Sequence, residues 1–287
     1  MISRIFYYFF IIPISLLPHK FLYIISDILY LLMFRILSYR KMVVFENLKN
    51  SFPKRSNDDI KTIMSKFYHH LCDLIVESLK GFTISENELK KRLIVRNPEL
   101  ANTYAEKGQS IILVGAHYNN WEIVAQTLGI YSKHKCIGIY KPLSNKFLNK
   151  KIYESRSKFG MGLVSMKESK SSFKDDGIPK AVIFGSDQNP SNPKKAYWLK
   201  FLNQDTGVLF GAEKYSKDNN WPVIYVTINK IKRGYYEVVY SLVTSNPKEE
   251  PYGKITEDFT KLIENDIVNN PQYWLWSHKR WKHKREK

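Results

Sequence analysis

The sequence contains few cysteines and few acidic side chains for its length of 287 residues. Its two cysteines, Cys72 and Cys136, are too few for a disulfide framework or a zinc site, and we expect both to be small core residues. The 27 acidic residues are outnumbered by 45 Lys and Arg, which gives a net charge of +18. Such a charge attracts polyanions, so the partner classes to consider are nucleic acid, anionic lipid and an acidic carrier protein.

Several common catalytic motifs are also missing. The sequence has no glycine-rich phosphate-binding loop and no Gly-x-Ser-x-Gly turn, so we do not expect a serine acyl-enzyme. It has no His-Glu-x-x-His, and the adjacent His69 and His70 would point about 100° apart on a helix, which excludes joint metal binding from one face. We therefore expect no metal and no cofactor.

Residues 1–37 are the most apolar part of the chain. The uncharged run Ile5–Leu17 is broken by Pro13, and a second apolar run covers Phe21–Leu37. A helix over the second run would reach about 25 Å, short of a hydrocarbon core of about 30 Å. Basic residues flank the runs: Arg4, Lys20, Arg35, Arg40 and Lys41. We predict that residues 1–40 anchor the protein by lying in or dipping into one leaflet, with a packed helical hairpin as the alternative.

From Leu93 onward, short apolar runs alternate with helical patterns, which predicts an α/β domain over residues 41–287. A capping pattern at Ser56–Asp59 begins a predicted helix that ends near Lys80. We expect the glycine-containing segment 203–207 to be a turn that opens a helix over 208–218. The other expected strands are 93–95, 111–114, 136–140, 163–165, 181–184, 196–202, 222–229 and 235–244. The other expected helices are 39–52, 98–107, 123–128, 145–159, about 168–174 and 254–268.

The stretch that organises the chain begins with the apolar run Ile111–Val114, typical of a buried strand, which ends at Gly115. His117 and Glu122 follow, before a helical pattern. On one helix these two side chains would lie about 140° apart, so they would not share a face. If His117 lies in the turn and Glu122 in the first helical turn, the carboxylate can fold back and fix the imidazole tautomer. The alternative is that Glu122 only complements the helix dipole.

A second strand end repeats this pattern. The apolar run Ala181–Phe184 stops at Gly185, and Asp187 and Gln188 follow. In open α/β sheets, ligands bind at the carboxyl ends of strands, so two such ends side by side would form one polar site on an apolar floor. The alternative is an ordinary turn in which Asp187 bonds to its own backbone.

The segment His117–Glu122 resembles the H-x4-[D/E] box of the bacterial lipid A late acyltransferases, the lauroyl and myristoyl transferases of the lysophospholipid acyltransferase superfamily. The last three residues of the box agree with the family's usual Gly-His-x-Gly-Asn-Trp-Glu, whereas Ala116 and Asn119 depart from the small residues most often found there. The resemblance covers most of the chain and includes Lys41–Pro53, Lys141–Gly160, Asp187-Gln188 and Trp276–Arg280. It implies a central mixed sheet flanked by helices, as in glycerolipid acyltransferases, with an N-terminal anchor on the cytoplasmic face of the inner membrane.

The resemblance also implies a reaction, the transfer of a fatty acyl chain from acyl carrier protein to a hydroxyl of a lipid A precursor. A hydroxyl needs a positioned base, and we expect His117 to be that base with Glu122 as its orienting partner. The tetrahedral oxyanion needs donors, for which backbone amides near Gly115 or the cations Arg156 and Lys141 are the choices. The expected substrate-binding residues are Arg156, which matches a basic position of the family, with Asp187, Gln188, Asn120 and Lys141.

Other functions remain open at this point. The same chemistry could act on another acceptor, such as a lysophospholipid or an aminoacyl lipid. A basic nucleic-acid-binding protein has the right charge, but the cations are spread along the chain and no nucleic-acid module is present, so we expect no nucleic-acid partner. A lipid-binding protein without catalysis is a third class. The aromatic and basic segment Trp274–Trp281 is predicted either to lie at the membrane interface or to form a packed C-terminal cap.

Overall fold

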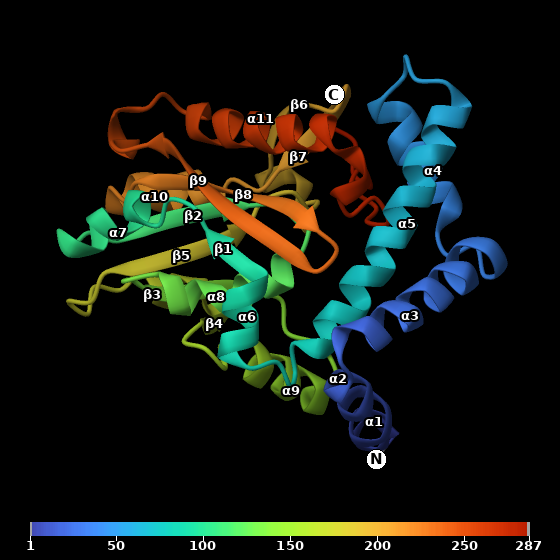
Figure 1. Cartoon of the computed structure of the whole chain (residues 1–287). Coiled ribbons are helices and arrows are strands. Elements are labelled where there is room, and N and C mark those ends of the chain that lie inside the picture. Colours follow the sequence, from blue (N-terminus) through green and yellow to red (C-terminus); the bar gives the residue numbers. More distant parts are fainter. Residues whose placement is uncertain (1, 286–287) are drawn as a thin grey trace.

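The computed structural model describes residues 2–285 and is built around a mixed sheet of seven strands in the order β1-β9-β8-β2-β5-β3-β4 (Figure 1). All neighbours pair in parallel except β8 and β9, which form an antiparallel hairpin. The predicted α/β fold with a mixed sheet flanked by helices is thus confirmed. The strands are β1 (Leu93–Val95), β2 (Ile111–Gly115), β3 (Lys135–Tyr140), β4 (Gly162–Ser165), β5 (Lys180–Gly185), β8 (Val223–Lys232) and β9 (Tyr235–Thr244).

Strand β2 lies at the centre because its apolar side chains fill both faces of the sheet. Successive side chains of a strand point to opposite faces. Accordingly, Ile111 and Leu113 enter one hydrophobic core, while Ile112 and Val114 enter the other. Strand β5 pairs beside β2 in parallel, with Gly115 opposite Gly185. The two glycine-terminated strands therefore end at the same edge of the sheet.

Helices cover both faces, with α11 and α10 on one side and α8 and α9 on the other (Figure 1). Helix α8 begins directly after the turn that leaves β2, and we call residues 116–120 the β2–α8 turn. The helices of this part are α6 (Glu86–Arg92), α7 (Glu99–Glu106), α8 (Trp121–Tyr131), α9 (Lys146–Ser157), α10 (Gly211–Asn219) and α11 (Lys254–Asn269).

Two local predictions have different outcomes. The predicted N-cap is confirmed at Ser56, which forms a capping box with Asp59 at the start of α5 (Asn57–Lys80), the helix after α4 (Lys41–Ser51). The turn expected over 203–207 is wrong, because β7 (Gln204–Val208) pairs there with β6 (Tyr197–Phe201) in an antiparallel hairpin. Helix α10 accordingly begins later than predicted, at Gly211.

The two cysteines are buried and free, as expected for core residues. Burial raises the pKa of Cys72 to about 12 and that of Cys136 to about 11. Both side chains therefore stay thiols at neutral pH and are poor nucleophiles.

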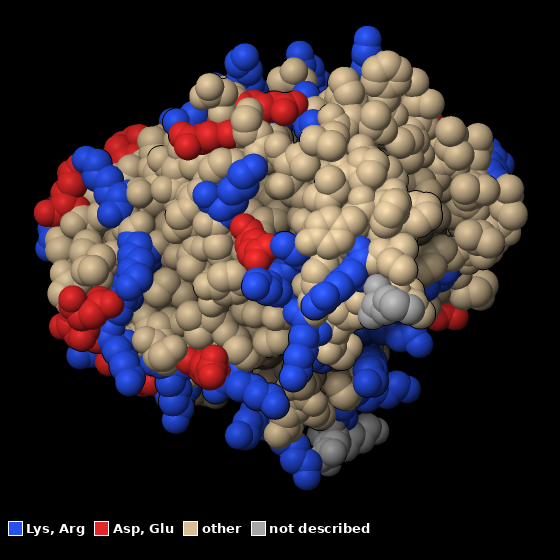
Figure 2. Space-filling model, turned by 90° about the horizontal axis from the view of Figure 1, so that it is seen from below, with Lys and Arg blue, Asp and Glu red and all other residues tan. Residues whose placement is uncertain are grey.

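The N-terminal helices α1 (Ile2–Phe6), α2 (Ile12–Leu16) and α3 (His19–Tyr30) run beside the α/β part, and α3 packs along α5 (Figure 1). Figure 2 views the molecule from the side of α1 and α9, and shows a broad area without charged side chains next to rows of Lys and Arg. Among residues 2–285, no single helix is long and apolar enough to cross a bilayer. The segments Ile2–Leu16 and His19–Ile36 meet that requirement only together, across a bend of 119°.

Candidate active site

A histidine and an aspartate meet at the common edge of β2 and β5. Nδ1 of His117, in the β2–α8 turn, lies 2.7 Å from Oδ1 of Asp187, which follows β5. The pairing of Gly115 with Gly185 places these side chains beside each other, although they are 70 residues apart in the chain. A side chain at Gly185 would crowd the imidazole, because its Cβ would lie 3.1 Å from Cε1 of His117. Because Gly185 has no side chain, the imidazole of His117 can lie close to Asp187 at the ends of the two strands.

Asp187 is buried, with 2% of its side chain exposed. Its second oxygen, Oδ2, accepts a hydrogen bond of 2.8 Å from the indole Nε1–H of Trp274. Burial alone would raise the pKa of Asp187, but the charge and hydrogen bond of His117 and the bond from Trp274 outweigh it and lower this pKa to about 2. The carboxylate is therefore ionised at neutral pH.

His117 has a defined tautomer and an open nitrogen. Because the Asp187 carboxylate only accepts hydrogen bonds, Nδ1 of His117 carries the proton and Nε2 is left to act as a base. The side chain is 27% exposed, and the ring of Trp121 packs against its edge at a centroid distance of 5.3 Å. Burial lowers the pKa of His117, but the charge and hydrogen bond of Asp187 raise it above its usual value overall.

The carboxylate of Glu122 has different partners from the one predicted. It accepts from Nε of Arg156 at 2.8 Å and also from Nη2 of the same guanidinium, and Trp121 Nε1–H donates to it at 3.2 Å. The prediction that Glu122 accepts from the imidazole of His117 and fixes its tautomer is wrong, because Asp187 occupies Nδ1. Glu122 lies in the first turn of α8 and reaches Arg156 on the adjacent helix α9.

The other predicted site residues lie around this pair in different ways. Asn120 is buried and caps α8 with Oδ1 accepting from Ile123 N at 3.0 Å, while its Nδ2 donates to Glu77 at 2.6 Å, so the structure gives it a capping role. Gln188 is half-buried beside Asp187, and Lys141 is exposed just after β3. Substrate contacts of Gln188 and Lys141 stay predictions.

Sequence reasoning missed the part played by the C-terminal segment. Trp274 is 2% exposed and Trp276 is fully buried, so the packed cap is the correct alternative for this segment. The cap also holds the β2–α8 turn, since Tyr118 and Trp274 form a β-bridge and Leu275 N donates to the carbonyl of His117 at 3.2 Å. No local pattern around Trp274 indicates that it meets residues more than 80 positions earlier.

A cavity of about 150 Å³ lies on the α9 side of the site. Its polar lining includes the Glu122–Arg156 pair together with Glu77 and Asn120, and apolar side chains such as Phe82 supply other walls. The site thus combines an imidazole with an open nitrogen at a strand end, a paired guanidinium and an adjoining cavity. This set can take a proton from a hydroxyl and stabilise negative charge nearby.

Comparison with known proteins agrees with this chemistry. The model of the family described as bacterial lipid A biosynthesis acyltransferase matches residues 2–283. A lipid A biosynthesis acyltransferase of Haemophilus influenzae is 20% identical over 85% of this chain and 78% of its own length. A lipid A biosynthesis palmitoleoyltransferase of Escherichia coli is 18% identical over 86% and 80%, and a lauroyltransferase of the same organism is 19% identical over 93% and 87%. Because the family model covers nearly the whole sequence, the chain belongs to the bacterial lipid A biosynthesis acyltransferase family.

Proposed function

We propose that this protein transfers a fatty acyl chain from the thioester of acyl carrier protein to a hydroxyl of a lipid A precursor, with His117 as the general base. Family membership supports acyl transfer to a lipid A precursor. The observation that carries the mechanism is the 2.7 Å contact between Nδ1 of His117 and buried Asp187, which leaves Nε2 open in a side chain that is 27% exposed.

In the proposed reaction, Nε2 of His117 takes the proton of the acceptor hydroxyl as its oxygen attacks the thioester carbonyl. The tetrahedral intermediate then collapses, the C–S bond breaks, and the imidazolium returns its proton to the departing thiolate. Asp187 stabilises the imidazolium between these two steps. A positioned base of this kind contributes about 10²–10⁴-fold to the rate.

The paired Glu122 and Arg156 have a proposed role beside the base. A guanidinium held by two parallel hydrogen bonds is fixed in direction, because the carboxylate matches its planar fork. The remaining N–H groups of Arg156 can then stabilise the oxyanion or hold a phosphate of the acceptor. Lys141 and Gln188 are proposed as substrate-binding residues at the same edge of the sheet.

The location of the enzyme is a further part of the proposal. Residues 1–40 are proposed to anchor it on the cytoplasmic face of the inner membrane, which is supported by exposed apolar side chains along the N-terminal helices. The net charge of +18 suits both an anionic lipid surface and an acidic carrier protein. The side chains exposed there include Ile2, Phe9, Phe10, Leu16, Phe21, Ile24, Ile28, Ile36 and Leu37.

The direct test is transfer by the purified protein from acyl carrier protein to a lipid A precursor, followed by mass spectrometry. A deletion strain provides the second arm, in which the proposal predicts lipid A with one acyl chain fewer. An unchanged acyl number together with transfer to a lysophospholipid or an aminoacyl lipid would replace the proposed acceptor. No transfer to any of these acceptors would reject the enzymatic function.

A further inference from the structure

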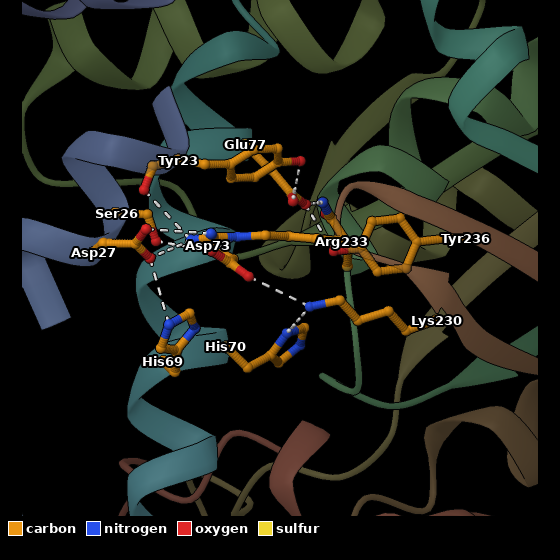
Figure 3. Close-up of polar contacts among 11 residues, drawn as sticks. Tyr23, Ser26, Asp27, His69, His70, Asp73, Glu77, Lys230, Arg233 and Tyr236 are labelled. Atoms are coloured by element: carbon orange, nitrogen blue, oxygen red, sulfur yellow. Dashed lines mark hydrogen bonds and ion pairs between the residues drawn. The ribbon is translucent and has the colours of Figure 1, made fainter. Parts of the chain in front are cut away.

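Glu77 of α5 is a half-buried carboxylate that the proposed reaction does not use. Its Oε1 accepts from the hydroxyl of Tyr23 at 2.9 Å, and its Oε2 accepts from the hydroxyl of Tyr236 at 2.7 Å and from Nδ2 of Asn120 at 2.6 Å. Figure 3 shows Glu77 between Tyr23 and Tyr236, which come from α3 and β9. One carboxylate therefore joins an N-terminal helix, the sheet and the β2–α8 turn.

The contact with Asn120 connects Glu77 to the proposed catalytic groups. Asn120 ends the β2–α8 turn and caps α8, whose first turn carries Trp121 and Glu122. Trp121 packs against the ring of His117, and Glu122 holds the guanidinium of Arg156. A displacement of the Asn120 side chain would consequently move the groups on both sides of the active site.

The neighbouring carboxylate Asp73, one helical turn before Glu77 on α5, contacts two of these elements, α3 and the sheet. It accepts from Ser26 of α3 at 2.8 Å and from Nε of Arg233, in the β8–β9 turn, at 2.8 Å (Figure 3). Lys230 of β8 donates to its other oxygen at 3.3 Å. Residues four apart on a helix lie on one face, so Asp73 fixes α3 and the hairpin where Glu77 meets Tyr23 and Tyr236.

We propose that Glu77 is a positioning residue for the acyl transfer, and that α3 contributes to this positioning through Tyr23. Glu77 holds Asn120, and Asn120 sets the start of α8 and with it Trp121 and Glu122. The proposal rests on the function proposed above, because its main readout is the rate of acyl transfer. It assigns to α3 a part in the reaction in addition to any contact with lipid.

The first test compares three variants with the wild type. Glu77→Ala removes the acceptor, and we expect kcat to fall by about 10²-fold with KM changed much less, as for a misplacement of about 1 Å. Glu77→Gln can still accept from Asn120, so kcat should stay within about threefold. Tyr23→Phe should lower kcat by about fivefold, the effect of one hydrogen bond.

A matched control for the helix contribution is Tyr30→Phe. This substitution also removes one hydroxyl of α3 that contacts α5, at 2.8 Å from Oγ of Ser65, but it has no connection to Glu77. Its kcat should equal that of the wild type. Equal losses in Tyr23→Phe and Tyr30→Phe, or an unchanged kcat in Glu77→Ala, would overturn the proposal.

Exchanging the charge between positions 77 and 120 distinguishes a positioning role of Glu77 from a merely structural one. Asn120→Asp keeps a good helix cap but places a second carboxylate in contact with Glu77, and two negative charges at hydrogen-bond distance repel each other. We expect this variant to lose about tenfold in kcat at pH 8, and to lose less as the pH falls and the pair takes up a proton. The double variant Glu77→Gln with Asn120→Asp should recover activity at pH 8, because the amide donates to the new carboxylate. Failure of the second substitution to restore kcat would contradict the contact.

A spectroscopic measurement without substrate tests the role of Glu77 independently of the proposed acyl transfer. Fluorotryptophan labelling with ¹⁹F NMR reports the surroundings of Trp121, assigned by loss of its signal in Trp121→Phe. The Trp121 resonance should shift in Glu77→Ala and stay in place in Glu77→Gln. If the wild type transfers no acyl chain, the proposed function fails, while an unmoved Trp121 resonance in Glu77→Ala would reject the positioning role itself.

Discussion

Replacing Asp187 by Asn removes the charge beside His117 while nearly preserving the size of the side chain. Asp187 accepts from two fixed donors, Nδ1–H of His117 and Nε1–H of Trp274. These donors meet different oxygens of the carboxylate, and an amide has one oxygen and one NH₂ group in those two places, so only one donor still faces an acceptor. If that oxygen faces Trp274, the amide N–H faces Nδ1, and the imidazole proton moves to Nε2, where it blocks the base.

The size of the effect follows from these contacts. In the opposite orientation the amide oxygen faces His117, and the indole N–H of Trp274 is left without an acceptor, which costs about 1–3 kcal/mol. The amide therefore prefers the first orientation, in which the imidazole carries its proton on Nε2. Loss of the charge-assisted bond to the imidazolium costs about 1.5–3 kcal/mol more, or roughly 10–150-fold in rate. We therefore expect kcat of Asp187→Asn to fall by between about 10² and 10⁴.

The Asp187→Asn variant should also shift the pH profile of kcat/KM in a defined direction. Asp187 holds the pKa of His117 above its usual value, and the base must be neutral to act, so kcat/KM of the wild type should rise with pH and level off above that pKa. Without the carboxylate, burial lowers the pKa of His117, so the rising limb should move to lower pH although the plateau is lower.

The assay is transfer from acyl carrier protein measured between about pH 5 and pH 9, a range on both sides of the ordinary pKa of histidine. The exposed Asp175, changed to Asn, is the control for loss of one negative charge. A plateau within threefold of the wild type, or a limb that moves to higher pH, would refute the pairing of Asp187 with the base.

Two further predictions concern the packing around this pair. Gly185→Ala should lower kcat by about tenfold, because its Cβ would lie 3.1 Å from Cε1 of His117 and displace the imidazole. The control Gly115→Ala, whose Cβ has its nearest contact at 3.7 Å, should keep a kcat near that of the wild type. Equal rates in the two variants would disprove this steric effect. The lowered pKa of Asp187, about 2 against 3.8, contributes about 2 kcal/mol of stability above pH 3.8 that is lost as the pH falls toward 2. Trp274→Phe should reduce this pH-dependent part in urea unfolding, and an unchanged pH dependence would show that the indole does not lower the pKa.

Much of the fold could be predicted from local patterns. The apolar runs that end at Gly115 and Gly185 are buried strands, and their polar followers lie at one edge of the sheet as expected. The segment 203–207 is not the turn that its glycine at position 207 favours. It pairs with β6 instead, and Gly207 lies opposite Trp198, where a Cβ would come within 3.4 Å of the indole.

The partner of His117 could not be found in the same way. The spacing from His117 to Glu122 describes only the local chain, and it is satisfied equally by a carboxylate that turns toward α9 and Arg156. Choosing Asp187 requires the pairing of β2 with β5, which joins residues 70 positions apart. The contact of Trp274 with Asp187 depends in turn on how the C-terminal segment folds back over the β2–α8 turn.

The most direct test of the mechanism is the rate of acyl transfer by His117→Ala beside the wild type, with thermal unfolding to establish that both are folded. The account predicts that kcat falls by about 10²–10⁴-fold while the protein still folds, with a lower unfolding temperature because buried Asp187 loses its charged partner. Transfer at the wild-type rate by folded His117→Ala would contradict the assignment of the imidazole as the base.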